Sequence, residues 1–454
     1  MRSRLAGLLL ALWLAACTHK PDLARLYASA HDNPDQPPVI LIHGIMGSKL
    51  RNRSTGKEIW PAGIARLVKE NFWPVALHID PETLQAHSGH LEAHAITDQI
   101  IGIDFYQSIM RTLEKYGNYQ WTTPGTPVHD TRKRYYVFIY DWRLDMVEIA
   151  SQLTDFIEQI RIDHNRPELK VDIVAHSMGG LVSRYFMRYG NKDVLDDDTF
   201  SINLHGADQV RRSVLLATPN LGSAEVLQSL ITGRRLGVVH IPPEVLATMP
   251  SLYQLLPHDM LSPLHSPAGI PLDIDIFDPA AWRRLQWGIY DPNIRNRIIT
   301  HFETPRQGKN FYRTLTGFFD KQLERARRFQ WALTVELPQP SHEFVVMGGD
   351  CLLTPSRLVL EQDRDSGKLK VRLWPARVQN RVKGVDYERL MLEPGDGKVT
   401  KSSLLARNSL DPNAPKRQYA GFPLKYPLFL CEKHERIPGN IFFQDNLLHI
   451  LLSH

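Results

Sequence analysis

The chain has 454 residues and a formal net charge of +5; 43% of its residues are hydrophobic and 23% are charged. These proportions are typical of a globular protein, and the mild charge, without a polybasic run, gives no sign of nucleic-acid binding. The three cysteines have no metal-site spacing, so the sequence implies neither a metal nor another cofactor. Beyond the N-terminus, no segment reaches the roughly 18 apolar residues of a membrane span.

The N-terminus has the pattern of a secretory signal. Met1–Arg4 is basic, and Leu5–Leu14 is an apolar stretch that is too short to span a bilayer. The tetrad Leu14–Cys17 that ends this stretch resembles the lipobox of bacterial lipoproteins, in which the cleaved chain begins at an acylated cysteine. We therefore expect residues 1–16 to be a lipoprotein signal peptide and Cys17 to be the lipidation site.

A lipid on Cys17 would anchor the protein to a membrane, because two or three acyl chains hold firmly where one is only marginal. Residues 17–37 would then form a lipidated tether. Thr18 rather than Asp follows the cysteine, and the resemblance to bacterial lipoproteins then implies a lipid-anchored protein of the bacterial cell envelope, at the outer membrane. The alternative is a plain signal peptide with an incidental cysteine.

The first strand of a sheet is expected at Val39–Ile42, which is wholly apolar, and a loop with the pattern His-Gly-x-x-Gly follows it at His43–Gly47. Residues 51–117 are expected to form a first insertion. The next strand is expected at Tyr135–Tyr140, followed by a helix at Val147–Ile162 whose apolar residues recur at helical spacing.

The most informative stretch is Val171–Gly180. An apolar, mostly β-branched strand runs into Ser177, and small residues flank the serine before a helix begins. This order of strand, serine and helix is the nucleophile elbow of α/β-hydrolases, with Ala175 in the place of the usual first glycine. Ser177 is therefore the predicted nucleophile.

A serine that accepts an acyl group needs two backbone N–H groups to hold the oxyanion. The residue directly after the nucleophile supplies one of them, which here is Met178. The other is expected from the glycine loop after the first strand, where Gly44 would let the backbone turn so that the N–H of Ile45 faces the reacting carbonyl.

Another strand is expected at Arg212–Ala217, which gives the βαβ alternation of a parallel sheet. Residues 38–454 are therefore expected to form an α/β-hydrolase fold, with a mostly parallel central sheet flanked by helices. The stretch 224–340 is too long for connecting units and is expected to be an inserted cap. Whether this cap shapes an apolar acyl pocket or merely buries its own core is open from the sequence.

The acid should follow the serine in the chain. Asp396 lies between Gly395 and Gly397, which suits a tight loop whose carboxylate reaches a histidine. Asp350 is the rival, because it also follows an apolar strand. We assign the acid to Asp396.

Three histidines lie beyond the predicted acid. His434 is in a polar loop before the apolar helix Ile441–Leu452, which suits a catalytic base. His449 lies within that helix and His454 is terminal. The base is therefore assigned to His434.

The two remaining cysteines are Cys351 and Cys431. In an oxidising compartment an even pair can form a disulfide, which would connect the loop after Asp350 to the loop of His434. A disulfide and two buried free thiols are both compatible with the sequence.

These motifs together resemble the family of lecithin:cholesterol acyltransferase and lysosomal phospholipase A2. They occur in the family's order, and Tyr-Asp-Trp-Arg is the most specific of them. The motifs are His43–Ser48, the region of Trp60, Tyr140–Arg143, Ala175–Gly180, Ala217–Asn220, Pro250–Pro257 and Gly395–Val399.

The resemblance implies a serine lipase, phospholipase or O-acyltransferase that passes an acyl chain from a lipid ester to water or to an alcohol. It implies the triad Ser177, Asp396 and His434 and a lipid substrate, and it gives no indication of a protein partner. The chain departs from the mammalian members, which have Pro-Gly at His43–Gly44 and a disulfide-closed loop where Asn52–Trp60 has no cysteine. The alternatives are an envelope-anchored carboxylesterase for other esters and an inactive binding protein of the same fold.

Overall fold

The computed structural model describes residues 20–30, 33, 35–97, 99–100, 103–104, 106–196, 199–335, 342–407 and 422–453. The expected signal peptide, Cys17 and His454 lie outside the described residues. Among the residues that are described, no helix combines the length and hydrophobicity that crossing a bilayer requires.

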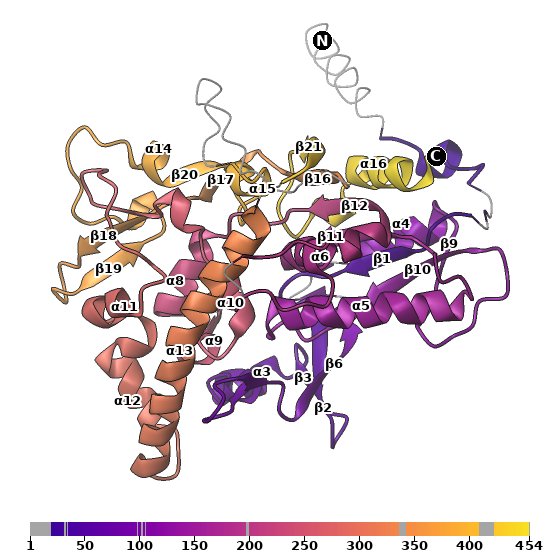
Figure 1. The fold of residues 1–454 in the computed structure, drawn as a ribbon. Helices are drawn as coiled ribbons and strands as arrows, with labels where there is room; N and C mark the ends of the chain where they lie inside the picture. Colours follow the sequence, from indigo (N-terminus) through magenta and orange to yellow (C-terminus); the bar gives the residue numbers. More distant parts are fainter. Residues whose placement is uncertain are drawn as a thin grey trace, which may run out of the picture.

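A seven-stranded sheet forms the centre of the molecule, and all of its neighbouring strands are parallel (Figure 1). The strand order is β21-β16-β12-β11-β1-β10-β9. In chain order the strands are β1 (Val39–Ile42), β9 (Tyr119–Trp121), β10 (Lys133–Phe138), β11 (Val171–His176), β12 (Val210–Leu216), β16 (Phe344–Gly349) and β21 (Leu424–Leu430). β21 is an edge strand, which is where a proline such as Pro427 is tolerated. The structure confirms the parallel sheet that the sequence predicts.

Helices cover both faces of this sheet, because alternate strand residues point to opposite sides. Ile40 and Ile42 of β1 belong to a core that includes residues of α5 (Met146–Asp163) and α6 (Met178–Tyr189). Val39 and Leu41 belong to a second core on the other face. That core is covered by α4 (Gln107–Lys115) and α16 (Ile441–Leu452), as Figure 1 shows. β1 is completely buried as a result.

The stretch after β1 holds a small antiparallel sheet in the order β3-β2-β6. Its elements are β2 (Ser48–Asn52), β3 (Glu58–Trp60), α3 (Ile64–Lys69) and β6 (Leu91–Ile96). α4 falls within the range of the expected first insertion but packs on the main sheet.

A second, largely helical segment follows β12 and forms the cap (Figure 1). Its elements are α8 (Ala224–Thr232), β13 (Arg234–Leu236), β14 (Val239–Ile241), α9 (Pro243–Leu246), α10 (Pro250–Gln254), α11 (Pro279–Leu285), α12 (Pro292–Thr300) and α13 (Pro305–Thr334). α13 has 30 residues and begins with a capping box between Thr304 and Gln307, followed by proline at its first position. At about 1.5 Å per residue it is about 45 Å long, and it runs along the cap.

The last third of the chain adds small antiparallel pairs beside the cap. β18 (Leu358–Gln362) and β19 (Leu369–Arg372) form a hairpin. β17 (Leu352–Pro355) pairs with β20 (Leu392–Gly395). β20 ends directly before Asp396, so the pairing of β17 with β20 fixes the position of Asp396.

Gly180, in the first turn of α6, has no room for a side chain. A Cβ on Gly180 would lie 2.0 Å from Oγ1 of the buried Thr218. We expect Gly180→Ala to lower the free energy of unfolding by about 1–3 kcal/mol, since overpacking forces backbone shifts. Gly317→Ala in α13 is the matched control, because its Cβ would lie 3.3 Å from a terminal methyl of Leu84. Urea unfolding of both variants measures this, and equal stabilities would contradict the packing argument.

Candidate active site

Ser177 lies on the sharp turn between β11 and α6. Its φ is 54° and its ψ is −123°, a combination that costs a residue with a side chain about 1–3 kcal/mol. The turn is fixed because the N–H of Ser177 donates to the carbonyl of Leu216 at 2.8 Å and its own carbonyl accepts from Gly180 at 3.0 Å. The neighbouring strand thus holds the serine in the strained geometry of an elbow.

The glycine loop after β1 packs directly on this turn. A Cβ on Gly44 would lie 2.8 Å from the Cβ of Ser177, and a Cβ on Gly179 would lie 2.5 Å from the carbonyl oxygen of His43. Gly44 does not have a positive φ, whereas Met46 does, at 63°. The turn expected at Gly44 is present, because the N–H of Gly47 donates to the Gly44 carbonyl at 3.1 Å. Gly44 has a second requirement, the absence of a side chain at the close approach to Ser177.

The amides of Ile45 and Met178 flank this contact. Met178 is the first residue of α6 and is buried, and Ile45 lines the cavity that opens over Ser177. In the described part of the chain neither N–H group donates a hydrogen bond. Both are therefore available to an external acceptor.

Asp396 and His434 meet through a direct hydrogen bond, although they lie on separate loops. Nδ1 of His434 lies 2.8 Å from Oδ2 of Asp396, and the backbone N–H of His434 donates to the Asp396 carbonyl at 2.9 Å. Oδ1 of Asp396 accepts from the N–H groups of Lys398 and Val399 at 2.9 and 2.8 Å. A buried carboxylate held in this way favours the tautomer of His434 in which Nδ1 carries the proton and Nε2 is a free acceptor.

Asp350 and His449, the alternatives for the acid and the base, have other surroundings. Asp350 pairs with Nζ of Lys401 at 2.8 Å, with its exposed fraction at 28%. His449 is exposed on α16 and lines a different cavity from Ser177. The geometry therefore brings Asp396 rather than Asp350 to His434.

Ser177 and His434 line one cavity of about 320 Å³. Its apolar wall comes from the glycine loop, the cap and the loop of Asp396, through Ile45, Met46, Val226, Leu236, Leu255 and Val399. The cap thus contributes to this cavity as well as burying its own core, which answers the question that the sequence left open.

Two buried histidines support the glycine loop from behind. His43 stacks on Tyr140 with ring centroids 3.9 Å apart, and the Tyr140 hydroxyl donates to the His43 carbonyl. Burial lowers the pKa of His43 to about 4 and lowers the pKa of His176 well below its usual value. Both rings are therefore neutral at neutral pH.

Tyr106 connects the glycine loop to the elbow, and sequence reasoning missed it. Its hydroxyl accepts from the N–H of Gly44 at 2.7 Å and lies 3.0 Å from Nδ1 of His176. Because the hydroxyl accepts from Gly44, its own proton can be donated to Nδ1 of the neutral His176. No motif surrounds Tyr106, so only the folded chain reveals this bridge.

The Tyr-Asp-Trp-Arg motif holds the first insertion against the sheet. The buried guanidinium of Arg143 donates to both carboxylate oxygens of Asp141 at 2.9 and 2.6 Å and to the Val75 carbonyl at 3.0 Å. Burial alone would raise the pKa of Asp141, but the charge of Arg143 and the hydrogen bonds from Arg143 and Ser88 together outweigh burial and keep that pKa below its usual value. This arrangement supports a structural role for Arg143.

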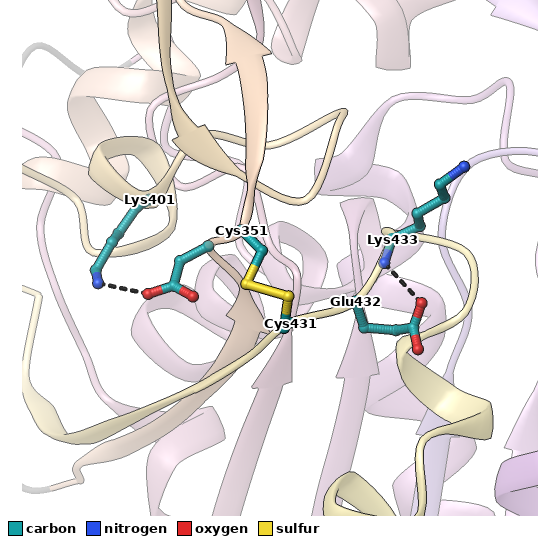
Figure 2. The surroundings of a disulfide bond; sticks show 6 residues. Cys351, Lys401, Cys431, Glu432 and Lys433 are labelled. Atoms are coloured by element: carbon teal, nitrogen blue, oxygen red, sulfur yellow. Dashed lines mark hydrogen bonds and ion pairs between the residues drawn. A yellow bond between two sulfur atoms is a disulfide. The ribbon is translucent and has the colours of Figure 1, made fainter. Parts of the chain in front are cut away.

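A disulfide joins Cys351 to Cys431, with a Cα–Cα distance of 5.0 Å and a sequence separation of 80 (Figure 2). Cys351 follows β16, and Cys431 follows β21, the strand that leads to His434. Of the two states that the sequence allowed, the structure thus has the bonded one.

The family comparison covers the centre of the chain. The model of the lecithin:cholesterol acyltransferase family matches residues 132–297. The chain resembles this family. The matched stretch contains Tyr140–Arg143, Ser177 and the first part of the cap, and it supports an enzyme that acts on lipid esters. None of the curated proteins compared with the chain matches it.

The structural comparison concerns the fold. The first similar structure is that of the Tle4–Tli4 complex, with 17% identity, a TM-score of 0.54, and coverage of 91% of this chain and 98% of that chain. Lipase BlEst2 of Bacillus licheniformis in its mature form has 10% identity, coverage of 93% and 94%, and a TM-score of 0.33. EstA from Clostridium botulinum has 13% identity, coverage of 96% and 92%, and a TM-score of 0.35. The likeness to the first shows a shared fold, and the fold is that of an α/β-hydrolase.

Paired asparagine variants test which aspartate serves His434. We expect Asp396→Asn to lower kcat on a short-chain chromogenic ester by about 10³–10⁴-fold, because the imidazole then loses the partner that sets its tautomer. Asp350→Asn is the control and should change kcat little, since Asp350 pairs with Lys401. A large loss in the control with little loss in Asp396→Asn would reverse the assignment.

The disulfide predicts a stability effect. Replacing Cys351 and Cys431 together by serine should lower the free energy of unfolding by about 2–4 kcal/mol, since the bond constrains the unfolded chain. Guanidinium unfolding measures this loss, and wild-type protein kept in dithiothreitol should match the double variant. Unchanged stability in both samples would mean that the bond adds nothing to this fold.

Proposed function

We propose that the protein is a serine hydrolase or acyltransferase that acts on acyl esters of lipids. The observation that carries the proposal is the hydrogen bond between His434 and Asp396 in a cavity that Ser177 also lines. The elbow geometry of Ser177 and the two free amides beside it support the same reading.

In the proposed reaction, Nε2 of His434 takes the proton of the Ser177 hydroxyl as the serine oxygen attacks the ester carbonyl. The N–H groups of Ile45 and Met178 hold the oxyanion that forms. When the intermediate collapses, the C–O bond to the alcohol breaks and His434 returns the proton to the leaving oxygen. Ser177 then carries the acyl group as an ester.

A second nucleophile completes the cycle. Water, activated by His434, would release a free fatty acid, and an alcohol would receive the acyl group as a new ester. The family resemblance and the apolar wall of the cavity support a lipid acyl chain as the group transferred. The residues described suffice for this chemistry without a cofactor.

The test uses the chain from Lys20 onward, which spans the described fold, with Ser177→Ala as the matched variant. Loss of Ser177 should lower ester turnover by about 10⁴–10⁶-fold and abolish labelling by a fluorophosphonate probe. Phospholipid vesicles are supplied with and without a long-chain alcohol, and products are identified by mass spectrometry.

Each product has one meaning in this test. Free fatty acid alone identifies a hydrolase, and a new ester of the added alcohol identifies an acyltransferase. Turnover of small esters without lipid turnover would favour the carboxylesterase alternative. No labelling of the wild-type protein would contradict the proposal and favour the inactive binding protein.

A further inference from the structure

In the glycine loop, both backbone polar groups of Gly44 are hydrogen bonded, and the N–H group that follows them is free. The N–H of Gly44 donates to the Tyr106 hydroxyl at 2.7 Å, and the Gly44 carbonyl accepts from the N–H of Gly47 at 3.1 Å. The N–H of Ile45 donates to no group among the described residues. Because a peptide group is planar, a bond that holds the Gly44 carbonyl also sets the opposite direction, in which the Ile45 N–H points.

The peptide group before Gly44 is held at both ends by tyrosine hydroxyls. Tyr140 donates to the His43 carbonyl, and Tyr106 accepts from the Gly44 N–H. Glycine has a wider range of backbone angles than any other residue, so without these bonds the next peptide group could turn about Gly44. The direction of the Ile45 N–H therefore depends on side chains that are distant from the loop in the chain.

Tyr106 also holds the residue that precedes the nucleophile. It is buried, and burial raises the pKa of its hydroxyl above its usual value, so the group stays protonated and can donate. The acceptor is Nδ1 of His176 at 3.0 Å, and His176 directly precedes Ser177. One hydroxyl thus connects the peptide group before the oxyanion donor to the elbow. Its removal would leave the N–H of Gly44 buried without this acceptor.

We propose that Tyr106 is a positioning residue of the candidate active site, whose hydroxyl keeps the N–H of Ile45 directed at the oxyanion. Tyr106 is not among the described residues that line the cavity of Ser177, so it acts through Gly44 and not on the substrate itself. Negative charge develops on the carbonyl oxygen only as Ser177 attacks, so a misdirected donor weakens binding of the transition state more than binding of the ester. The inference rests on the proposed function and adds a residue to it.

Tyr106→Phe tests this role, because the ring stays and only the hydroxyl is removed. The variant is made in the chain from Lys20 onward and assayed with a soluble short-chain chromogenic ester. We expect kcat to fall by about ten-fold or more with little change in KM, since loss of a whole oxyanion donor costs about 10²–10³-fold. The pH profile of kcat/KM should keep its shape, because Asp396 and His434 are unchanged.

A trifluoromethyl ketone reports on the oxyanion contacts directly. The Ser177 oxygen adds to its carbonyl carbon, the serine proton passes to Nε2 of His434, and the oxyanion of the resulting hemiketal lies where Ile45 and Met178 can donate to it. The affinity for this ketone should fall in Tyr106→Phe by about the same factor as kcat/KM. Unchanged affinity for the ketone together with a lower kcat would overturn the proposed role at the oxyanion.

Tyr185→Phe is the matched control. The buried hydroxyl of Tyr185 likewise accepts from a backbone N–H, that of Val194 at 3.1 Å, and donates to the Lys192 carbonyl at 3.0 Å. Both variants should lower the melting temperature to a similar extent, because each takes an acceptor from one backbone N–H. Turnover and ketone affinity should fall only in Tyr106→Phe, and equal losses of turnover in the two variants would overturn the proposal.

The wild-type protein separates the two proposals. An active wild-type protein with an equally active Tyr106→Phe variant would reject the positioning role and retain the reaction. A wild-type protein that neither turns over the ester nor binds the ketone would reject the proposed reaction, and the role of Tyr106 with it.

Discussion

The candidate site depends on one close approach, that of the glycine loop after β1 to the elbow after β11. The backbone of Gly44 touches Ser177 so closely that no side chain fits between them. β1 and β11 are neighbours in the sheet, so their carboxyl ends, and the loops that follow, meet at one edge. The strained backbone of Ser177 and the amides of Ile45 and Met178 are set by this contact. Tyr106 and Tyr140 then hold the loop from behind through hydrogen bonds and stacking.

The acid and base reach the same edge by a different route. β20, which pairs antiparallel with β17, leads to Asp396, and β21, which pairs parallel with β16, leads to His434. These two pairings bring the two side chains into one hydrogen bond. The disulfide between Cys351 and Cys431 joins the ends of β16 and β21 (Figure 2). The position of His434 is therefore fixed by covalent and backbone restraints that lie outside the cavity itself.

The sequence predicted those features that rest on local pattern. The strand before Ser177, the helix Ile441–Leu452 and the loop of Asp396 follow from hydrophobic periodicity and turn residues, and the structure has elements at these places. Tyr106 could not be found in this way, because its partners Gly44 and His176 are distant in the chain. The turn of the glycine loop was predicted correctly, but its close approach to the elbow was not, since a contact between two loops leaves no mark in either sequence alone.

The long helix α13 has a mechanical consequence for the cap. Its final carbonyl groups accept hydrogen bonds from α6: Arg184 donates to Leu333 and Tyr189 to Ala332, both at 2.7 Å. α6 begins at Met178, directly after Ser177, so these hydrogen bonds connect the long helix of the cap to the helix that follows the elbow. A rigid-body rotation of the cap that includes α13 would therefore also displace α6 and the elbow. Any rearrangement of the cap that leaves Ser177 in place therefore has to keep these two hydrogen bonds between α6 and α13.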